Sequence, residues 1–125
     1  MIKPIDSILH APYLPEHVKK FIDKLFNIIE KHYTACDFTV KKLVNLIALS
    51  ERQLQRKVKY IFNLTPAEFI RHYRLHKAKP LLIEGKPVAS VAYMVGFSSP
   101  NYFSRCFKEV FGLTPSDFIA QLFIH

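Results

Sequence analysis

The chain has 125 residues, of which 50% are hydrophobic and 22% charged, so it can form a buried core and is not a disordered tail. Its three glycines form no glycine-rich loop, which excludes the phosphate-binding fingerprints of P-loop and dinucleotide-binding proteins. No stretch reaches the roughly 18 apolar residues that a membrane-spanning helix requires, so we expect no membrane contact.

The two cysteines, Cys36 and Cys106, lie far apart without a CxxC partner, and this spacing fits neither a disulfide framework nor a zinc site. Free thiols are typical of a reducing compartment, and the N-terminus lacks the apolar run of a secretory signal. We therefore expect a cytoplasmic protein.

The formal net charge of +8 is concentrated in the middle of the chain. Residues 39–79 contain ten lysines and arginines against only Glu51 and Glu68, whereas residues 1–38 and 80–125 each carry balanced charges. A concentrated basic segment on a globular chain suggests a polyanionic partner.

Apolar residues between Val18 and Ile29 recur at three- and four-residue spacing, which predicts a first amphipathic helix. Pro15 and Glu16 suit its start, because proline at the first helical position loses no bonded N–H and an acid there favours the helix dipole. No window shows the sustained alternation of apolar and polar residues that is typical of strands.

Helix starts and ends recur along the rest of the chain. Ser50-Glu51-Arg52-Gln53 and Thr65-Pro66-Ala67-Glu68 are capping boxes, in which the two outer side chains each satisfy a backbone N–H. Three pairs ending in proline mark further starts, and two glycines lie where helices should end: Lys86-Pro87, Ser99-Pro100, Thr114-Pro115, Gly85 and Gly112. We predict an all-α fold of about seven helices, over residues 16–34, 39–47, 50–62, 65–84, 87–95, 99–111 and 114–122.

The sequence contains an internal repeat. Residues 50–70 align with residues 99–119 without a gap, and nine of the 21 paired positions are identical. Each copy, with the segment before it, predicts a short helix, a tight turn at Ala48 or Gly96, and a second helix. This is the helix-turn-helix layout, whose second helix (the recognition helix) enters the major groove of DNA.

In both predicted recognition helices, apolar residues fall on one side and long polar side chains on the other. Arginine, glutamine and asparagine make bidentate contacts with base edges in the major groove, so the polar side matches base readout. It comprises Arg52, Gln55, Arg56 and Lys59 in the first copy and Asn101, Tyr102, Arg105 and Lys108 in the second.

Over about residues 16–119 the sequence resembles the DNA-binding domain of the AraC/XylS family of bacterial transcription regulators. The resemblance follows the family's pattern of IA, VGF, YFSRxFK and GxTP, here Val91-Ala92, Gly96-Phe97-Ser98, Tyr102-Phe103-Ser104-Arg105-Cys106-Phe107-Lys108, Phe111-Gly112 and Thr114-Pro115. It implies two helix-turn-helix units whose recognition helices enter successive major grooves on one face of duplex DNA. The implied base-reading residues are Arg52, Gln55, Arg56, Asn101, Tyr102 and Arg105.

The resemblance also implies an order of parts. A lead-in over residues 1–15 precedes the DNA-binding domain over 16–125, which comprises a first unit (39–64), a long linker helix (65–84) and a second unit (87–113). We expect phosphate contacts from Thr39, Lys41, Lys42, Lys57, Lys59 and Lys108.

Members of this family tend to carry a sensing domain on a longer chain, and the helix over 16–34 resembles the one that precedes this domain in hybrid two-component regulators. Besides double-stranded DNA, we therefore expect RNA polymerase or a covalently linked sensor domain as partners. The sequence departs from the family at four positions. Ile119 stands where the family has an arginine after the final aromatic residue, and Pro100 occupies a second-unit position that often helps to read bases. Pro80 lies inside the linker helix, at a cost of about 3 kcal/mol unless the helix kinks, and Ala48 replaces the usual glycine of the turn.

Other functions have weaker support. His72 and His76 have the spacing of a two-histidine metal face but no third ligand nearby, so we expect no metal or other cofactor and place both on the linker surface near phosphate. We expect no enzymatic activity, because a Cys/His pair requires an organised pocket. The eleven phenylalanines are expected mostly in the core rather than on a single-strand stacking platform. The alternative to DNA binding is a basic helical module that docks on an acidic protein partner.

Overall fold

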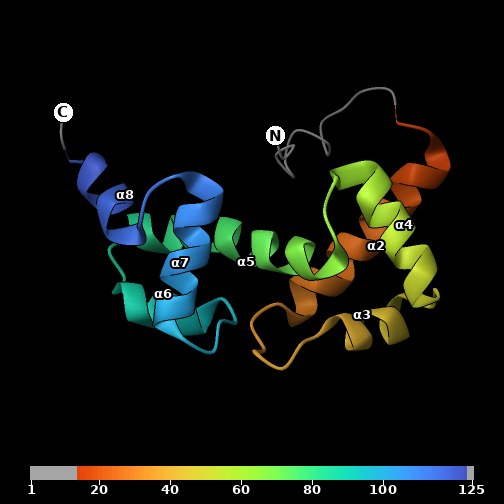
Figure 1. Cartoon of the computed structure of the whole chain (residues 1–125), viewed down its shortest axis with the longest axis horizontal. Coiled ribbons are helices and arrows are strands. Elements are labelled where there is room, and N and C mark those ends of the chain that lie inside the picture. The colour runs from red at the N-terminus through yellow and green to blue at the C-terminus, as the bar shows by residue number, and fades with distance from the viewer. Residues whose placement is uncertain (1–13, 124–125) are drawn as a thin grey trace. The chain divides into compact units, whose positions relative to one another are not determined.

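The computed structural model describes residues 14–123, and Figure 1 shows their helices in chain order. Within this span there are seven helices and no strand, which confirms the prediction of an all-α fold. No helix of these residues is long and apolar enough to cross a membrane. The lead-in expected over residues 1–15 lies almost wholly outside the described residues. The helices are α2 (Glu16–His32), α3 (Val40–Ile47), α4 (Glu51–Phe62), α5 (Pro66–Ile83), α6 (Val88–Met94), α7 (Pro100–Phe111) and α8 (Pro115–Gln121).

The helices begin where their capping residues predict. At the start of α4, the Ser50 N–H donates to Oε1 of Gln53 at 3.0 Å, and the Gln53 N–H donates to the Ser50 hydroxyl at 3.1 Å. Thr65 and Glu68 form the same reciprocal pair at the start of α5, at 2.9 and 3.1 Å. Both predicted capping boxes are confirmed. Each satisfies two backbone N–H groups that the first turn of a helix leaves without a partner.

The chain forms two compact units, and the first comprises the described residues up to His32 together with Phe38–Ile70. In this unit α3 packs against α2 and α4. The rings of Phe26, Phe62 and Phe69 lie with their centroids 4.7 to 6.2 Å apart. Around them the unit buries Ile22, Leu25, Ile29, Phe38, Leu43, Ile47, Leu54, Val58, Leu64 and Ile70.

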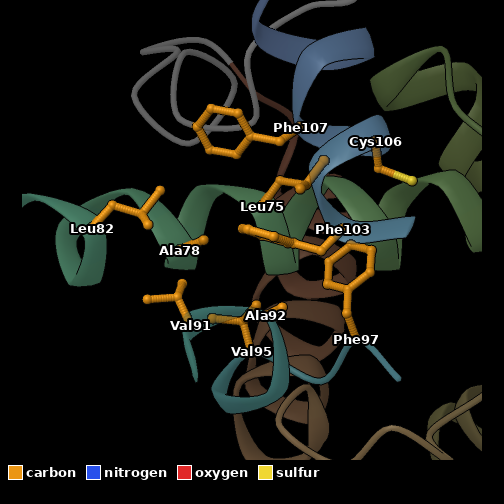
Figure 2. Packing of buried hydrophobic residues seen from close by; sticks show 10 residues of the cluster. All are labelled: Leu75, Ala78, Leu82, Val91, Ala92, Val95, Phe97, Phe103, Cys106 and Phe107. Atoms are coloured by element: carbon orange, nitrogen blue, oxygen red, sulfur yellow. The ribbon is translucent and has the colours of Figure 1, made fainter. Parts of the chain in front are cut away.

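The second unit comprises Tyr33–Asp37 and the residues from Arg71 onward. Figure 2 shows side chains of α5, α6 and α7 converging on one core in this unit. Phe103 lies near its middle, with the Phe97 ring centroid at 5.2 Å and that of Phe107 at 5.8 Å. The core contains Leu75, Ala78, Leu82, Val91, Ala92, Val95, Phe97, Phe103, Cys106 and Phe107.

Arg74 of α5 fixes the short segment Tyr33–Asp37 within the second unit. Its Nε donates to the Tyr33 carbonyl and its Nη2 to the Ala35 carbonyl, both at 2.9 Å. Arg74 is only 9% exposed, and this burial lowers the pKa of its guanidinium, an effect that the nearby Cys36 partly opposes. The role of Arg74 is therefore structural, although Arg74 is one of the ten cations of residues 39–79.

Five of the described residues have left-handed backbone conformations, and one of them is Asn63, directly after α4, with φ 58°. Gly85 and Gly112 have φ angles of +91° and +84° and follow the ends of α5 and α7, as predicted. Ala48 adopts φ 60° in the first helix-turn-helix turn, a conformation that costs an alanine roughly 1–2 kcal/mol relative to glycine. The equivalent residue of the second turn is Gly96, with φ 96°. Farther along, α5 continues through Pro80 to its end at Ile83.

Gly96 and Gly112 make a matched pair for measuring how closely the backbone packs beside Arg74. A Cβ at Gly96 would meet the Tyr33 carbonyl and lie 2.7 Å from Nε of Arg74, whereas a Cβ at Gly112 would meet no atom within 4 Å. We expect Gly96→Ala to lower the free energy of unfolding by about 3 kcal/mol or more, because it adds overpacking to backbone strain. Gly112→Ala should cost only about 1 kcal/mol, from strain alone. Chemical denaturation measures both, and equal losses would contradict the close approach at Gly96.

Candidate nucleic-acid interface

The α4 helix exposes a polar face because its apolar face is buried in the core of the first unit. Leu54, Val58 and Phe62 are completely buried, and their spacing of four residues places them on one side. The opposite side is solvent-exposed, as the sequence predicts. It carries Arg52, Gln55, Arg56 and Lys59. The phosphate candidate Lys57 is also exposed, with its ammonium 5.6 Å from the centroid of the Phe21 ring.

The α7 helix repeats this arrangement in the second unit. Phe103, Cys106 and Phe107 are buried, and the hydroxyl of Ser99 caps the helix by accepting from the Tyr102 N–H at 3.3 Å. Proline at the first position leaves no unsatisfied N–H there. Asn101, Tyr102, Arg105 and Lys108, the polar side expected from the sequence, are exposed, and so is the acidic Glu109.

The remaining residues assigned to phosphate lie at the start of α3. Thr39 is the N-cap of that helix, and its hydroxyl accepts from the Lys42 N–H at 3.4 Å. Thr39, Lys41 and Lys42 are all exposed. The amino end of a helix favours anions, so this first turn suits a phosphate group.

Tyr60 is an exposed aromatic residue on α4 that the sequence analysis did not single out. It is 88% exposed and lies one helical turn after Arg56. The two residues line a pair of open hollows of about 660 and 480 Å³ in the first unit. Gln55 and Lys59 line the larger hollow, and Phe21 of α2 lines the smaller. The i, i+4 spacing from Arg56 was the sequence signal that places Tyr60 on this face.

Several cations of the basic segment have structural partners. Besides the buried Arg74, the Lys79 ammonium lies 3.8 Å from the centroid of the Phe111 ring. Lys77 lies 5.7 and 5.5 Å from the centroids of the Tyr33 and Tyr73 rings. These α5 residues stabilise the second unit through cation–π contacts and hydrogen bonds. The charge excess of residues 39–79 therefore overstates what a polyanion meets.

The expectation that His72 and His76 both lie on the helix surface is wrong for His72, which is 6% exposed. Its neighbours Tyr73 and Leu75 are also buried, so this stretch of α5 lacks a clear solvent face. His76 is partly buried, with its ring 5.3 Å from that of Phe111. Within residues 14–123 no group of three His, Cys, Asp or Glu side chains is placed to hold a metal ion.

The Tyr102 side chain lies at the boundary between core and surface, with 39% of it exposed. A hydrogen bond with the Cys106 side chain, and secondarily burial, raises the pKa of its phenol, while the positive charge of Arg71 acts in the opposite direction. The phenol therefore stays protonated to a higher pH than that of an ordinary tyrosine, and Tyr102 is a neutral residue of the exposed face.

Comparisons with known proteins identify relatives that match most of this chain. Residues 43–121 match the family model of a helix-turn-helix domain. The chain is 37% identical over 101 residues to histidine kinase P4 of Formosa agariphila, an alignment that covers 80% of this chain and 7% of the kinase. It spans less than half the length of the curated relatives that it matches.

Two solved structures are also similar. The C-terminal domain of the two-component response regulator yesN from Fusobacterium nucleatum is 32% identical in sequence. Its superposition has a TM-score of 0.70 and covers 78% of this chain and 95% of that one. A probable AraC family transcriptional regulator from Rhodopseudomonas palustris is 26% identical, with a TM-score of 0.68 covering 82% and 96%.

Proposed function

Since this chain belongs to the AraC-type helix-turn-helix family and is a DNA-binding domain of transcription regulators, we propose that it reads two successive segments of the major groove, one with α4 and one with α7. The observation that carries the proposal is the repeated division of these helices. Each buries its apolar side and exposes the side chains that recognise base edges. An interaction module for acidic proteins would not require this pattern twice.

The proposed base contacts come from Arg52, Gln55 and Arg56 of α4 and from Asn101 and Arg105 of α7, with Tyr102 on the same surface. Arginine recognises guanine, and glutamine and asparagine recognise adenine, through paired hydrogen bonds in the major groove. Phosphate contacts, which set register and add affinity without reading sequence, are assigned to Thr39, Lys41, Lys42, Lys57, Lys59 and Lys108.

The domain organisation expected from the sequence, with a first unit over 39–64, a linker over 65–84 and a second unit over 87–113, forms part of this proposal. We also propose that the domain is the output part of a longer bacterial signalling protein that acts in the cytoplasm. One similar structure comes from a two-component response regulator, and the chain matches only 7% of the kinase named above.

The partners of the whole protein follow from this proposal. They would be a linked sensor domain and RNA polymerase. The domain itself would have no enzymatic activity, because its exposed face carries groups suited to binding rather than to covalent chemistry. Although the first relative is named as an enzyme, the aligned part is a small fraction of its length.

Selection of bound sequences from a random duplex pool tests the function directly. The expected result is enrichment of one asymmetric sequence, with binding that weakens as salt increases. Recovery of an unenriched pool, or tighter binding to an acidic protein surface than to any duplex, would overturn the proposal in favour of the docking alternative.

Arg56 and Arg105 occupy equivalent positions in the repeat and should serve equivalent roles. If both read bases, replacing either by alanine should weaken binding to the selected site by about 1–3 kcal/mol. The base preference should relax only in the half of the site that the altered unit reads. Competition binding with point-substituted duplexes measures this, and uniform weakening across all sequences would instead assign the arginine to phosphate.

The two exposed faces differ in sequence, so the preferred site should be non-palindromic. A single chain should cover two major-groove segments separated by about 34 Å, or one helical turn. Sedimentation of the complex gives the stoichiometry, and footprinting gives the extent of the protected site. An inverted repeat that only dimers occupy would contradict this arrangement.

The location of the exposed lysines predicts an unequal salt dependence. Replacing Lys41, Lys42, Lys57 and Lys59 together by glutamine should reduce the slope of log affinity against log salt by about 0.9 for each lysine that contacts phosphate. The preferred sequence should not change. The matched control is the pair Lys86 and Lys108, whose replacement should change the slope by no more than about two units. A larger effect from this pair than from the first four would disprove the charge argument.

A further inference from the structure

The guanidinium of Arg105 lies over the aromatic ring of Tyr102. The Cζ atom of Arg105 is 5.4 Å from the ring centroid, within the range of a cation–π contact. The two residues are three positions apart on α7, so they are neighbours on one face of the helix. The ring is thus next to the arginine to which we assign base reading in the second unit.

The Tyr102 ring is itself held by the core of the second unit. Its centroid lies 5.8 Å from that of Phe97, which is only 4% exposed and lies 5.2 Å from the ring of Phe103. The phenol interacts with the side chain of Cys106, which is also buried. The contacts with Phe97 and Cys106 therefore hold the Tyr102 ring in place beside Arg105.

The first unit has no aromatic residue at the position equivalent to Tyr102. Gln53 occupies the position in the repeat that Tyr102 occupies in the second unit. Its side chain is engaged in the capping box, where Oε1 accepts the Ser50 N–H at 3.0 Å. Arg56, the counterpart of Arg105, therefore has no ring three residues before it on its own helix.

From these contacts we infer that Tyr102 is a positioning residue that holds the Arg105 guanidinium in place for a base, rather than a residue that reads a base itself. The inference rests on the proposed function. An unrestrained arginine loses rotamer freedom when it docks, and a planar guanidinium held on a ring loses less of it on binding. Tyr102 would therefore increase the selectivity of the second unit without adding a contact of its own to DNA.

The test uses the full chain and the duplex obtained by selection, with competition binding at the base pair that Arg105→Ala relaxes. Tyr102→Gln removes the ring and introduces the residue present at the equivalent position of the first unit, where it completes a capping box after serine. It should lower the preference at that base pair about two- to fivefold, the range of an exposed cation–π contact, and leave the half of the site read by α4 unchanged. Tyr102→Phe keeps the ring and should retain the parental preference.

A double variant separates positioning from direct contact. In the Arg105→Ala background, Tyr102→Gln should have no further effect on base preference, because there is no guanidinium left to position. Tyr93→Gln is the matched control, since it removes a tyrosine of α6 that is 57% exposed and lies outside the recognition helix. It should leave the preference unchanged, and thermal unfolding confirms that each variant folds.

An additive effect of Tyr102→Gln on Arg105→Ala would overturn the inference, and so would an undiminished preference in Tyr102→Gln alone. A finding that Arg105→Ala relaxes no base pair would do so as well. A measurement without DNA separates failure of the inferred contact between Tyr102 and Arg105 from failure of the proposed DNA-binding function. Ring-current shifts on the Arg105 side-chain protons, measured by NMR in the free chain, should be present in the parent and in Tyr102→Phe and lost in Tyr102→Gln. Their absence from the parent would disprove the contact whether or not the chain selects a DNA sequence.

Discussion

The burial of one side of each recognition helix is the constraint on which the rest of the structure depends. Leu54, Val58 and Phe62 in α4, like Phe103 and Phe107 in α7, are fully removed from solvent. Burying a side chain of this size contributes about 1.5–3 kcal/mol, so rotation of either helix about its axis would be costly. The same burial determines which residues face outward, and it therefore gives each helix a defined polar face for a partner.

The two units share this plan but differ in how they support it. In the first, Gln53 serves the helix cap and the exposed cations are numerous. In the second, the aromatic core extends through Phe97 to Tyr102, whose ring lies under the guanidinium of Arg105. A repeat that keeps its core and caps can thus change the chemistry of its exposed face, and these differences favour non-equivalent roles for the two units on DNA.

The cations of α5 show that charge in the sequence is not the same as charge at a surface. Arg74 donates two hydrogen bonds to backbone carbonyls, and Lys79 lies against the Phe111 ring. A buried guanidinium that satisfies carbonyl groups repays part of its desolvation through charge-assisted hydrogen bonds. Such residues stabilise the fold, so within residues 39–79 the exposed cations that can meet a polyanion are the lysines and arginines of α3 and α4.

Within residues 14–123, the number of helices, their limits to within two residues, and the polar sides of α4 and α7 were predictable from the sequence, as were the capping boxes. These features depend on residues within about four positions of one another, so the periodicity of apolar residues and the capping boxes are sufficient to specify them. The six base-reading candidates were predictable as exposed residues for the same reason, although their contacts with DNA stay predictions.

Only the tertiary structure decided the burial of His72, the role of Arg74 and the need for glycine at position 96. Arg74 bonds to Tyr33, 41 positions earlier in the chain, and the two residues together leave no room for a Cβ at Gly96. The arrangement of Arg105 over Tyr102 was likewise not predictable, because the helix spacing permits the contact but the buried Phe97 ring supports it. Contacts between segments distant in sequence have no local pattern, and they depend on which side chains the folded core brings together.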